Sequence, residues 1–270
     1  MAKLRTHLSW QFYKLNKLLK PKEEEKFIPS ENDIYLVSYP RSGNTWMRVM
    51  LAELMYGESG ESLAELGYYM PDSKKPQSIK NIIQSDFHII KTHDPYMRNR
   101  LSENFRKVIY LVRDPRDVVI SWHRFSAVSY YKFDLDQFIF EWVTGRIYPT
   151  SWSTHVSSWT GPGYEKMNIE MCIIKYEDLL VDTITNLKKV ADFIELDKSE
   201  DALRNAVKKG SAKQMRKKEK NGFWEKDIDK EKLEFIGDAT NYQWKRKLTN
   251  DQITLIEKYS EIEMKQFGYI

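Results

Sequence analysis

Short strand-like segments alternate with longer helix-like segments along this chain of 270 residues, and this order constrains the fold more than any other feature. Four segments rich in β-branched and aromatic residues are predicted strands: Asp33–Val37, Phe87–Lys91, Lys107–Val112 and Glu170–Lys175. Helical patterns cover six ranges: Thr45–Tyr56, Pro115–Val128, Leu135–Gly145, Asp178–Ile194, Ser199–Lys208 and Asn250–Phe267. The alternation predicts an α/β domain, residues 29–270, with a central parallel sheet flanked by helices.

The composition limits the class of protein. The chain is 41% hydrophobic, which suffices for one sizeable core. Its single cysteine, Cys172, excludes an internal disulfide framework and a cysteine-built zinc site. No spacing of His, Asp and Glu stands out as a metal site, and no signal peptide or bilayer-length apolar run is evident. These observations favour a cytoplasmic protein.

The positive charge is concentrated at the N-terminus. Residues 1–22 contain six Lys and Arg and no acidic residue, so the rest is nearly neutral although the whole chain carries +4. A nearly neutral body argues against a nucleic-acid-binding protein. Residues 1–28 form a separate basic segment, in which apolar residues recur at helical spacing: Leu4, Leu8, Phe12, Leu15 and Leu19. This amphipathic segment can lie on an anionic membrane surface or pack on the body, and both readings stay open.

The turn after the first predicted strand, "SYPRSGNTW" at Ser38–Trp46, has the features of an anion site. Gly43 permits a tight turn, and the helix that follows presents unsatisfied N–H groups and the positive end of its dipole. Arg41 adds a permanent charge, Thr45 a hydroxyl donor and Trp46 a flat face for a base. The usual P-loop pattern is absent, so this is a P-loop-like strand–turn–helix without that motif.

Polar residues also follow the other three strands, where ligands gather in open α/β sheets. His93 in "KTHDP" can act as a general base near neutral pH. Arg113 and Ser121 in "RDPRDVVISW" can grip a second phosphate, or Arg113 can pair with a nearby Asp. Tyr176 in "KYEDL" can contact a base.

Capping residues fix two of the predicted helix starts. Asp114, Pro115 and Asp117 match an N-cap, a first helical position and the acidic partner of a capping box. Asp178 is expected to cap the following helix.

These four motifs, in this order, resemble the 3′-phosphoadenylyl-sulfate (PAPS)-dependent sulfotransferase family, from about residue 30 to the C-terminus. The resemblance implies PAPS as donor, adenosine 3′,5′-bisphosphate (PAP) as product, and no metal. It implies that the 5′-phosphosulfate lies at the first turn, on Arg41, Ser42, Gly43, Asn44 and Thr45. By the same resemblance Arg113 and Ser121 hold the 3′-phosphate, and Trp46, Tyr176 and Ser211 contact the adenine.

The resemblance also implies a mechanism. His93 takes a proton from an acceptor hydroxyl or amine, which attacks the sulfur in line. Arg41 stands where much of the family has lysine, so it stabilises charge on the leaving oxygen rather than donating a proton. Lys91 and Ser121 are the other predicted catalytic residues.

Two family patterns are missing. The late motif that normally adds cations to the 3′-phosphate reads "FIGDATNYQW" here, with Gly237 and Asp238 in place of Arg and Lys. Either the grip is weaker, or Arg216, Lys217 and Lys218 reach in from the polar stretch Met215–Lys232, the predicted mobile loop. The dimerisation pattern is not visible either, so the oligomeric state stays open.

The acceptor is not identified by the sequence. Three segments that would shape its pocket are rich in aromatic residues and favour a small apolar or aromatic acceptor: Tyr56–Asn81, Tyr96–Phe105 and Ser129–Trp159. Two alternatives to a sulfotransferase remain. One is a small-molecule kinase, which would need a phosphate-loop lysine and a carboxylate for magnesium. The other is a nucleotide sensor or membrane-docking module without transfer activity.

Overall fold

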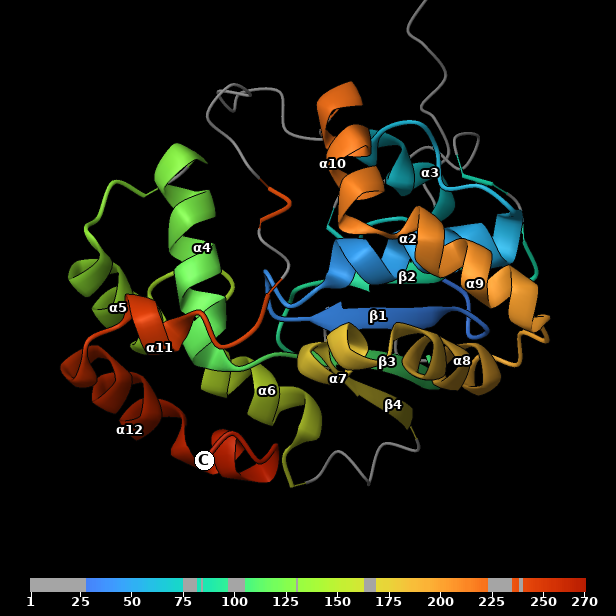
Figure 1. The fold of residues 1–270 in the computed structure, drawn as a ribbon. Helices are drawn as coiled ribbons and strands as arrows, with labels where there is room; N and C mark the ends of the chain where they lie inside the picture. The colour runs from blue at the N-terminus through green and yellow to red at the C-terminus, as the bar shows by residue number, and fades with distance from the viewer. Residues whose placement is uncertain are drawn as a thin grey trace, which may run out of the picture.

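The computed structural model describes residues 28–74, 82–83, 85–96, 105–129, 131–162, 169–222, 235–237 and 240–270. Its centre is a four-stranded sheet with the order β2-β1-β3-β4, in which every neighbouring pair is parallel (Figure 1). The strands are β1 (Ile34–Ser38), β2 (Ile89–Thr92), β3 (Lys107–Val112) and β4 (Glu170–Lys175). The predicted single α/β domain with a parallel sheet is therefore confirmed.

The register aligns the carboxyl ends of the four strands. Val37 pairs with Thr92, Ser38 with Leu111, and Val112 with Lys175. The residues after each strand, including the turn after β1, therefore emerge at one edge of the sheet. Because all four strands run in the same direction, this edge is where an open α/β sheet binds its ligand.

Helices cover both faces of the sheet (Figure 1). Side chains of β1 alternate between two apolar clusters, Tyr35 and Val37 in one and Ile34 and Leu36 in the other. The Ile34 cluster includes residues of α2 (Asn44–Tyr56), α8 (Thr183–Phe193) and α9 (Glu200–Lys209). The Tyr35 cluster includes residues of α4 (Pro115–Ser129), α5 (Leu135–Val143), α6 (Trp152–Thr160) and α12 (Asn250–Gln266). The sheet is thus the middle layer of three, which holds its edge rigid.

Shorter helices complete the fold around the sheet edge. They are η1 (Leu63–Glu65), α3 (Leu66–Tyr69), α7 (Tyr176–Val181), α10 (Ala212–Asn221) and α11 (Trp244–Lys247). All predicted strands, and all predicted helices except the one over Asp178–Ile194, begin and end within about two residues of the observed bounds. Five helices were not predicted: η1, α3, α6, α10 and α11.

The helix predicted over Asp178–Ile194 is wrong, because the structure has two helices there. The backbone leaves helical geometry at Asp182, with φ −138° and ψ 82°. Its carboxylate accepts the Thr185 N–H at 3.1 Å and so caps α8. Since α7 already begins at Tyr176, Asp178 lies inside that helix and does not cap it.

The predicted mobile loop Met215–Lys232 is wrong in its first part. Residues up to Asn221 belong to α10, where Met215 is buried in the Tyr35 cluster. The Lys218 ammonium donates to the main-chain oxygen of Gly60, which ties α10 to the turn before η1. Residues 223–234 lie outside the described residues.

The basic amphipathic segment predicted over residues 1–28 lies outside the described residues except for Ile28, so its role stays a prediction. Among the helices that the structure describes, none has both the length and the apolar character needed to cross a membrane.

Candidate active site

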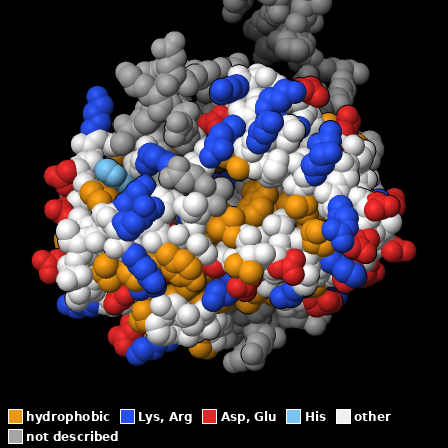
Figure 2. Space-filling view, in the orientation of Figure 1, with side chains coloured by type: hydrophobic (Ala, Val, Ile, Leu, Met, Phe, Trp, Pro, Cys, Tyr) orange, Lys and Arg blue, Asp and Glu red, His pale blue; other side chains and the backbone are white. Residues whose placement is uncertain are grey.

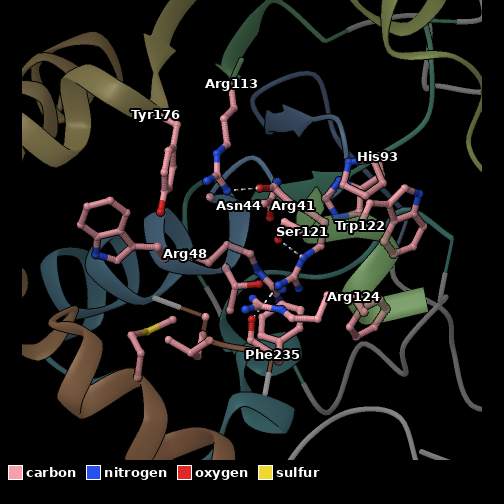
Figure 3. A pocket seen from close by; sticks show the side chains of 18 of the residues that line it. Arg41, Asn44, Arg48, His93, Arg113, Ser121, Trp122, Arg124, Tyr176 and Phe235 are labelled. Atoms are coloured by element: carbon pink, nitrogen blue, oxygen red, sulfur yellow. Dashed lines mark hydrogen bonds between the residues drawn. The ribbon is translucent and has the colours of Figure 1, made fainter. Parts of the chain in front are cut away.

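A cavity of about 900 Å³ opens at the carboxyl edge of the sheet. It receives residues that follow all four strands, among them Arg41, His93, Arg113 and Tyr176. Figure 3 shows these side chains converging from separate elements. In Figure 2 the face that carries α4 and α10 has many Lys and Arg side chains around a central group of apolar ones. A cavity with a cationic surround suits an anionic ligand that also carries an apolar part.

The turn between β1 and α2 has the backbone that the sequence predicts for an anion site. Arg41 and Gly43 both have left-handed φ values, 73° and 94°. A Cβ atom at Gly43 would lie 2.8 Å from the ring of Tyr176, so glycine is required here both by φ and by space. The turn ends at the first residue of α2, Asn44, where the helix presents its free N–H groups.

Two buried polar atoms of this turn have no partner among the described residues. They are the Ser42 hydroxyl and the Oδ1 atom of Asn44. The amide nitrogen of Asn44 donates to Leu36 O at 3.3 Å and to the Ser38 hydroxyl at 3.2 Å, which fixes the side chain. Buried polar atoms without partners are costly, so a ligand or water that satisfies them is expected at this turn.

The side chain of Arg41 crosses the cavity to α4. Its Nε donates to the Ser121 hydroxyl at 3.1 Å, and its Nη2 donates to Phe235 O at 2.6 Å. Its guanidinium also lies 4.2 Å from the ring centre of Phe235. Burial, with Arg124 and Arg113 nearby, lowers the pKa of Arg41 to about 9. Arg41 therefore remains a cation at pH 7, and the nearby carboxylate of Glu219 offsets only part of this lowering.

Arg113 stands at the exit of β3 and binds main-chain oxygens on both sides. Its Nη1 donates to Arg41 O and its Nη2 to Thr240 O, both at 3.1 Å. Its guanidinium lies 4.2 Å from the ring centre of Tyr176, and its Nε has no partner among the described residues. The alternative pairing with a nearby Asp is present in weak form, because Asp117 lies 3.9 Å away. Arg113 is thus held in place with donor capacity left over.

Asp117 has a different role from the one predicted. Its carboxylate accepts the N–H groups of Tyr242 at 2.7 Å and of Trp244 at 3.0 Å. It therefore fastens the segment before α11 to the start of α4 instead of completing a capping box. The predicted helix start is confirmed, since α4 begins at Pro115 and the Asp114 carboxylate accepts the Arg116 N–H at 2.9 Å.

Trp46 and Tyr176 form an aromatic corner of the cavity. Their ring centres lie 5.9 Å apart with an angle of 71° between the planes. Both side chains line the cavity, so a flat base has two rings to contact there.

His93 follows β2 and lines the cavity near Arg41. Its Nδ1 lies 2.7 Å from Ser38 O, the last carbonyl oxygen of β1. Burial and the neighbouring Lys91 hold the pKa of His93 well below its usual range. The imidazole is therefore neutral at pH 7.

Lys91 also lines the cavity, but its ammonium is in an ion pair. Its Nζ donates to the Asp72 carboxylate at 2.8 Å. Burial raises the pKa of Asp72, but the charge and hydrogen bond of Lys91, together with the Lys74 N–H, outweigh this, so the net shift is downward. Asp72 thus holds the charge of Lys91 at the edge of the cavity.

Four predicted donor-binding residues do not line the cavity. Ser42 is buried within the turn after β1, between Arg41 and Gly43, which do line it. Ser211 is exposed at the start of α10, although its neighbours Gly210 and Ala212 do line it. Arg216 and Lys217 are exposed on α10. The Arg216 guanidinium donates to Gly237 O at 2.9 Å and so supports the late segment from outside.

The cavity is also lined by charged and aromatic residues that were not predicted: Arg48, Trp122, Arg124, Phe125 and Phe235. Asp72, Lys74, Tyr131 and Tyr148 line it from two of the segments that were expected to shape the acceptor pocket. Two of the residues that were not predicted could have been found from helical spacing. Arg124 follows Ser121 by three residues, and Arg48 follows Asn44 by four, so each lies on the same helix face as a predicted residue.

Comparison with known proteins agrees with this geometry. Residues 31–268 match the model of the sulfotransferase domain family. The chain is 26% identical to the amine sulfotransferase of Oryctolagus cuniculus, over 90% of this chain and 84% of the relative. It is 24% identical to sulfotransferase 2A6 of Rattus norvegicus, over 90% and 88%.

Solved structures show the same fold. Mouse sulfotransferase SULT7A1 complexed with PAP has a TM-score of 0.66 at 20% identity, covering 88% of this chain and 86% of that one. Retinol dehydratase in complex with retinol and PAP has a TM-score of 0.68 at 18% identity, covering 88% and 82%. Since the family model spans nearly all of the described domain, the chain belongs to the sulfotransferase domain family, whose enzymes depend on 3′-phosphoadenylyl sulfate.

Proposed function

We propose that this chain transfers a sulfuryl group from PAPS to a hydroxyl or amine of a small acceptor, with His93 as general base. The observation that carries the proposal is the meeting of three features in one cavity: a neutral imidazole, an arginine turn at a helix start, and an aromatic corner.

The residues present fit a nucleotide with phosphate at two positions. The turn at Ser42–Thr45 offers helix N–H groups and the unpaired Ser42 hydroxyl to the 5′-phosphosulfate. Arg113 and Ser121, which contact the main-chain oxygen and the Nε of Arg41, are assigned to the 3′-phosphate. Trp46 and Tyr176 then flank the adenine. PAP is the product expected to remain in the site, and the two solved structures named above are complexes with PAP.

His93 is assigned the proton transfer. The Nε2 atom accepts the proton as the acceptor oxygen or nitrogen forms its bond to sulfur. The bond between sulfur and the 5′-phosphate oxygen breaks, and its electron pair stays on that oxygen. Arg41, which cannot readily give up a proton at pH 7, stabilises this charge electrostatically. Lys91, although paired with Asp72, adds positive potential on the His93 side.

The acceptor pocket is assigned to the part of the cavity beyond His93. Trp122, Phe125 and Tyr131 give it apolar and aromatic walls. Lys74 adds a charged group whose Nζ lies 2.6 Å from the Asp94 carboxylate and 4.2 Å from the ring centre of Tyr148. We therefore assign it a small aromatic acceptor that also carries a polar group. Retinol in one solved relative is likewise a small, largely apolar molecule.

Calorimetry with PAP is the first test of this function. We expect the purified chain to bind PAP, and to sulfate at least one member of a panel of phenols, alcohols and amines when PAPS is supplied. The absence of both heat and thermal stabilisation at millimolar PAP would contradict the proposal. Binding of PAP with no transfer to any acceptor would favour the nucleotide sensor instead.

We also infer a cytoplasmic location, in keeping with the free, buried Cys172. Peripheral membrane contact through residues 1–22 is a separate proposal that rests on sequence alone. Co-sedimentation with anionic vesicles, with and without residues 1–22, tests it. Equal sedimentation of the two forms would exclude that segment as the membrane contact.

A further inference from the structure

The late segment of the cavity wall lacks a side chain where the sulfotransferase motif normally has arginine. The main chain of Gly237 lines the cavity, but the residue can offer no cation. Ile236 and Phe235 before it are apolar, and the Phe235 and Ile236 N–H groups are held by the Glu219 carboxylate at 2.5 and 3.2 Å. The segment is therefore anchored, yet it brings no positive charge of its own to a phosphate.

The guanidinium of Arg124 occupies the space that a side chain at position 237 would fill. A Cβ atom at Gly237 would lie 2.0 Å from Arg124 Nη2 and 2.9 Å from its Cζ. Arg124 lies on α4 three residues after Ser121, so both side chains extend from the same helix face. Figure 3 shows Arg41, Ser121 and Arg124 directed into the same part of the cavity.

The charge balance around Arg124 is incomplete. Its buried Nε has no hydrogen-bond partner, and none of the described carboxylates forms an ion pair with it. Its charge instead opposes that of Arg41, whose guanidinium it faces. Arg113, another guanidinium of the cavity, also has an unpartnered Nε. Arg41, Arg113 and Arg124 together carry more positive charge than the neighbouring carboxylates neutralise, and they have unused N–H donors. A bound dianion is expected in such surroundings.

We propose that the guanidinium of Arg124 binds the 3′-phosphate of the donor nucleotide and replaces the cation that position 237 lacks. This inference rests on the proposed function, since it assigns one residue to the nucleotide of that same site. The positive charge has moved from the late segment to α4, and the small residue at 237 makes room for it. Arg216 and Lys217, which lie exposed on α10, are not needed for this contact.

Calorimetry with two nucleotides tests the assignment. PAP carries the 3′-phosphate, and adenosine 5′-phosphate lacks it. Arg124→Met should weaken the affinity for PAP by at least about tenfold, the value expected for lost charge-assisted hydrogen bonds. The affinity for adenosine 5′-phosphate should stay within about twofold of the wild-type value. Arg124→Lys should retain part of the preference for PAP. Equal weakening of both nucleotides, or unchanged binding of PAP, would overturn the assignment.

A matched control and an exchange variant sharpen the result. Arg204 on α9 is exposed and paired with Glu200, so Arg204→Met should alter neither affinity. In an Arg124→Ala background, Gly237→Arg should restore much of the preference for PAP, because the space is then free. Failure of this folded double variant to recover any preference would contradict a phosphate lying between positions 124 and 237.

Thermal unfolding without nucleotide separates binding from folding. Arg124→Met should unfold at or above the temperature of the wild type, since it relieves repulsion with Arg41. A clear decrease would mean that Arg124 serves the fold, against the proposal. If the wild type binds neither nucleotide, the result contradicts the proposed function itself, and with it the role of Arg124. If it binds PAP and the Arg124 variants bind it equally well, only the role of Arg124 fails.

Discussion

The Nδ1 atom of His93 lies 2.7 Å from the main-chain oxygen of Ser38, so two adjacent strands orient the imidazole together. A carbonyl oxygen can only accept a hydrogen bond, and Nδ1 must therefore carry the proton. The ring is neutral because burial and the charge of Lys91 hold its pKa well below the usual range. Its Nε2 is then an unprotonated acceptor, which is the state that a general base requires.

Replacing His93 by Gln tests this role. We expect a loss of about 10²- to 10⁴-fold in the rate of transfer, as for other removed general bases, with PAP affinity nearly unchanged. Single-turnover kinetics and calorimetry measure the two quantities separately. His88, which precedes β2 and is paired with Asp33, provides the control: His88→Gln removes an imidazole at the opposite strand end. A His93 variant with full turnover would exclude this residue as the base.

The pH dependence of transfer follows from the lowered pKa of His93. Because the folded protein holds the imidazole neutral below its ordinary pKa of 6.5, acidification should not protonate the free enzyme's base until well below that value. We therefore expect kcat/KM to stay flat as the pH falls from about 8 to 6.5. An acid limb with its midpoint at or above 6.5 would show that the imidazole is not shielded.

Gly43 and Gly57, at the two ends of α2, allow a paired test of the first turn. Both have left-handed φ values, 94° and 76°, so alanine at either position costs about 1–2 kcal/mol in backbone strain. Only at Gly43 would the added Cβ meet the Tyr176 ring, at 2.8 Å, whereas nothing lies within 4 Å at Gly57. Gly43→Ala should therefore lose more stability than Gly57→Ala and also weaken PAP binding.

Chemical unfolding and calorimetry on the two variants separate strain from contact. The difference between their unfolding free energies measures the displacement of Tyr176. If Gly43→Ala bound PAP as tightly as Gly57→Ala, the Tyr176 ring would not form part of the nucleotide site.

The sheet and its edge were predictable because their signals are local. Buried parallel strands are continuous apolar runs, and β1 and β3 read as such from Ile34 and Val108 onward. Parallel topology then places the residue after each strand at one edge without further information. His93, Arg113 and Tyr176 were brought to a single cavity by this rule alone.

Contacts between distant segments were not predictable in this way. Asp117 has the spacing of a capping residue, yet its partners Tyr242 and Trp244 come 125 and 127 residues later. The overlap of Arg124 with Gly237 depends on where the late segment crosses α4, which no local pattern encodes. The apolar periodicity predicted one continuous helix through Asp182, but the structure has two helices there. The Asp182 side chain caps α8, and this capping competes with the hydrogen bonds of a continuous helix.

The Asp117 carboxylate should contribute strongly to stability. It is buried and accepts two main-chain N–H groups, so Asp117→Asn leaves one of them facing an amide that cannot accept. We expect the unfolding free energy to fall by about 2 kcal/mol, as for a lost hydrogen bond to a charged group. The exposed Asp136, which accepts from Gln252 at 2.6 Å, is the matched control, and Asp136→Asn should change stability by under about 0.5 kcal/mol. Equal effects in urea unfolding would mean that the Asp117 contact does not anchor the segment.

His155 should make the protein sensitive to acid. Burial lowers the pKa of this imidazole, which lies 3.0 Å from the Tyr110 hydroxyl, to about 3. The unfolded chain binds a proton at this site below about pH 6.5, whereas the folded protein does not, so stability is lost as the pH falls from about 6.5 toward 3. His155 contributes a slope of about 1.4 kcal/mol per pH unit in this window, and His93 adds to it in the same direction. His155→Gln should be less stable than the wild type at pH 8, where the Tyr110 contact is lost, but its stability should decline less steeply toward pH 5. Urea unfolding at intervals across that range measures both slopes, and parallel curves would show that His155 takes up its proton equally well in the folded state.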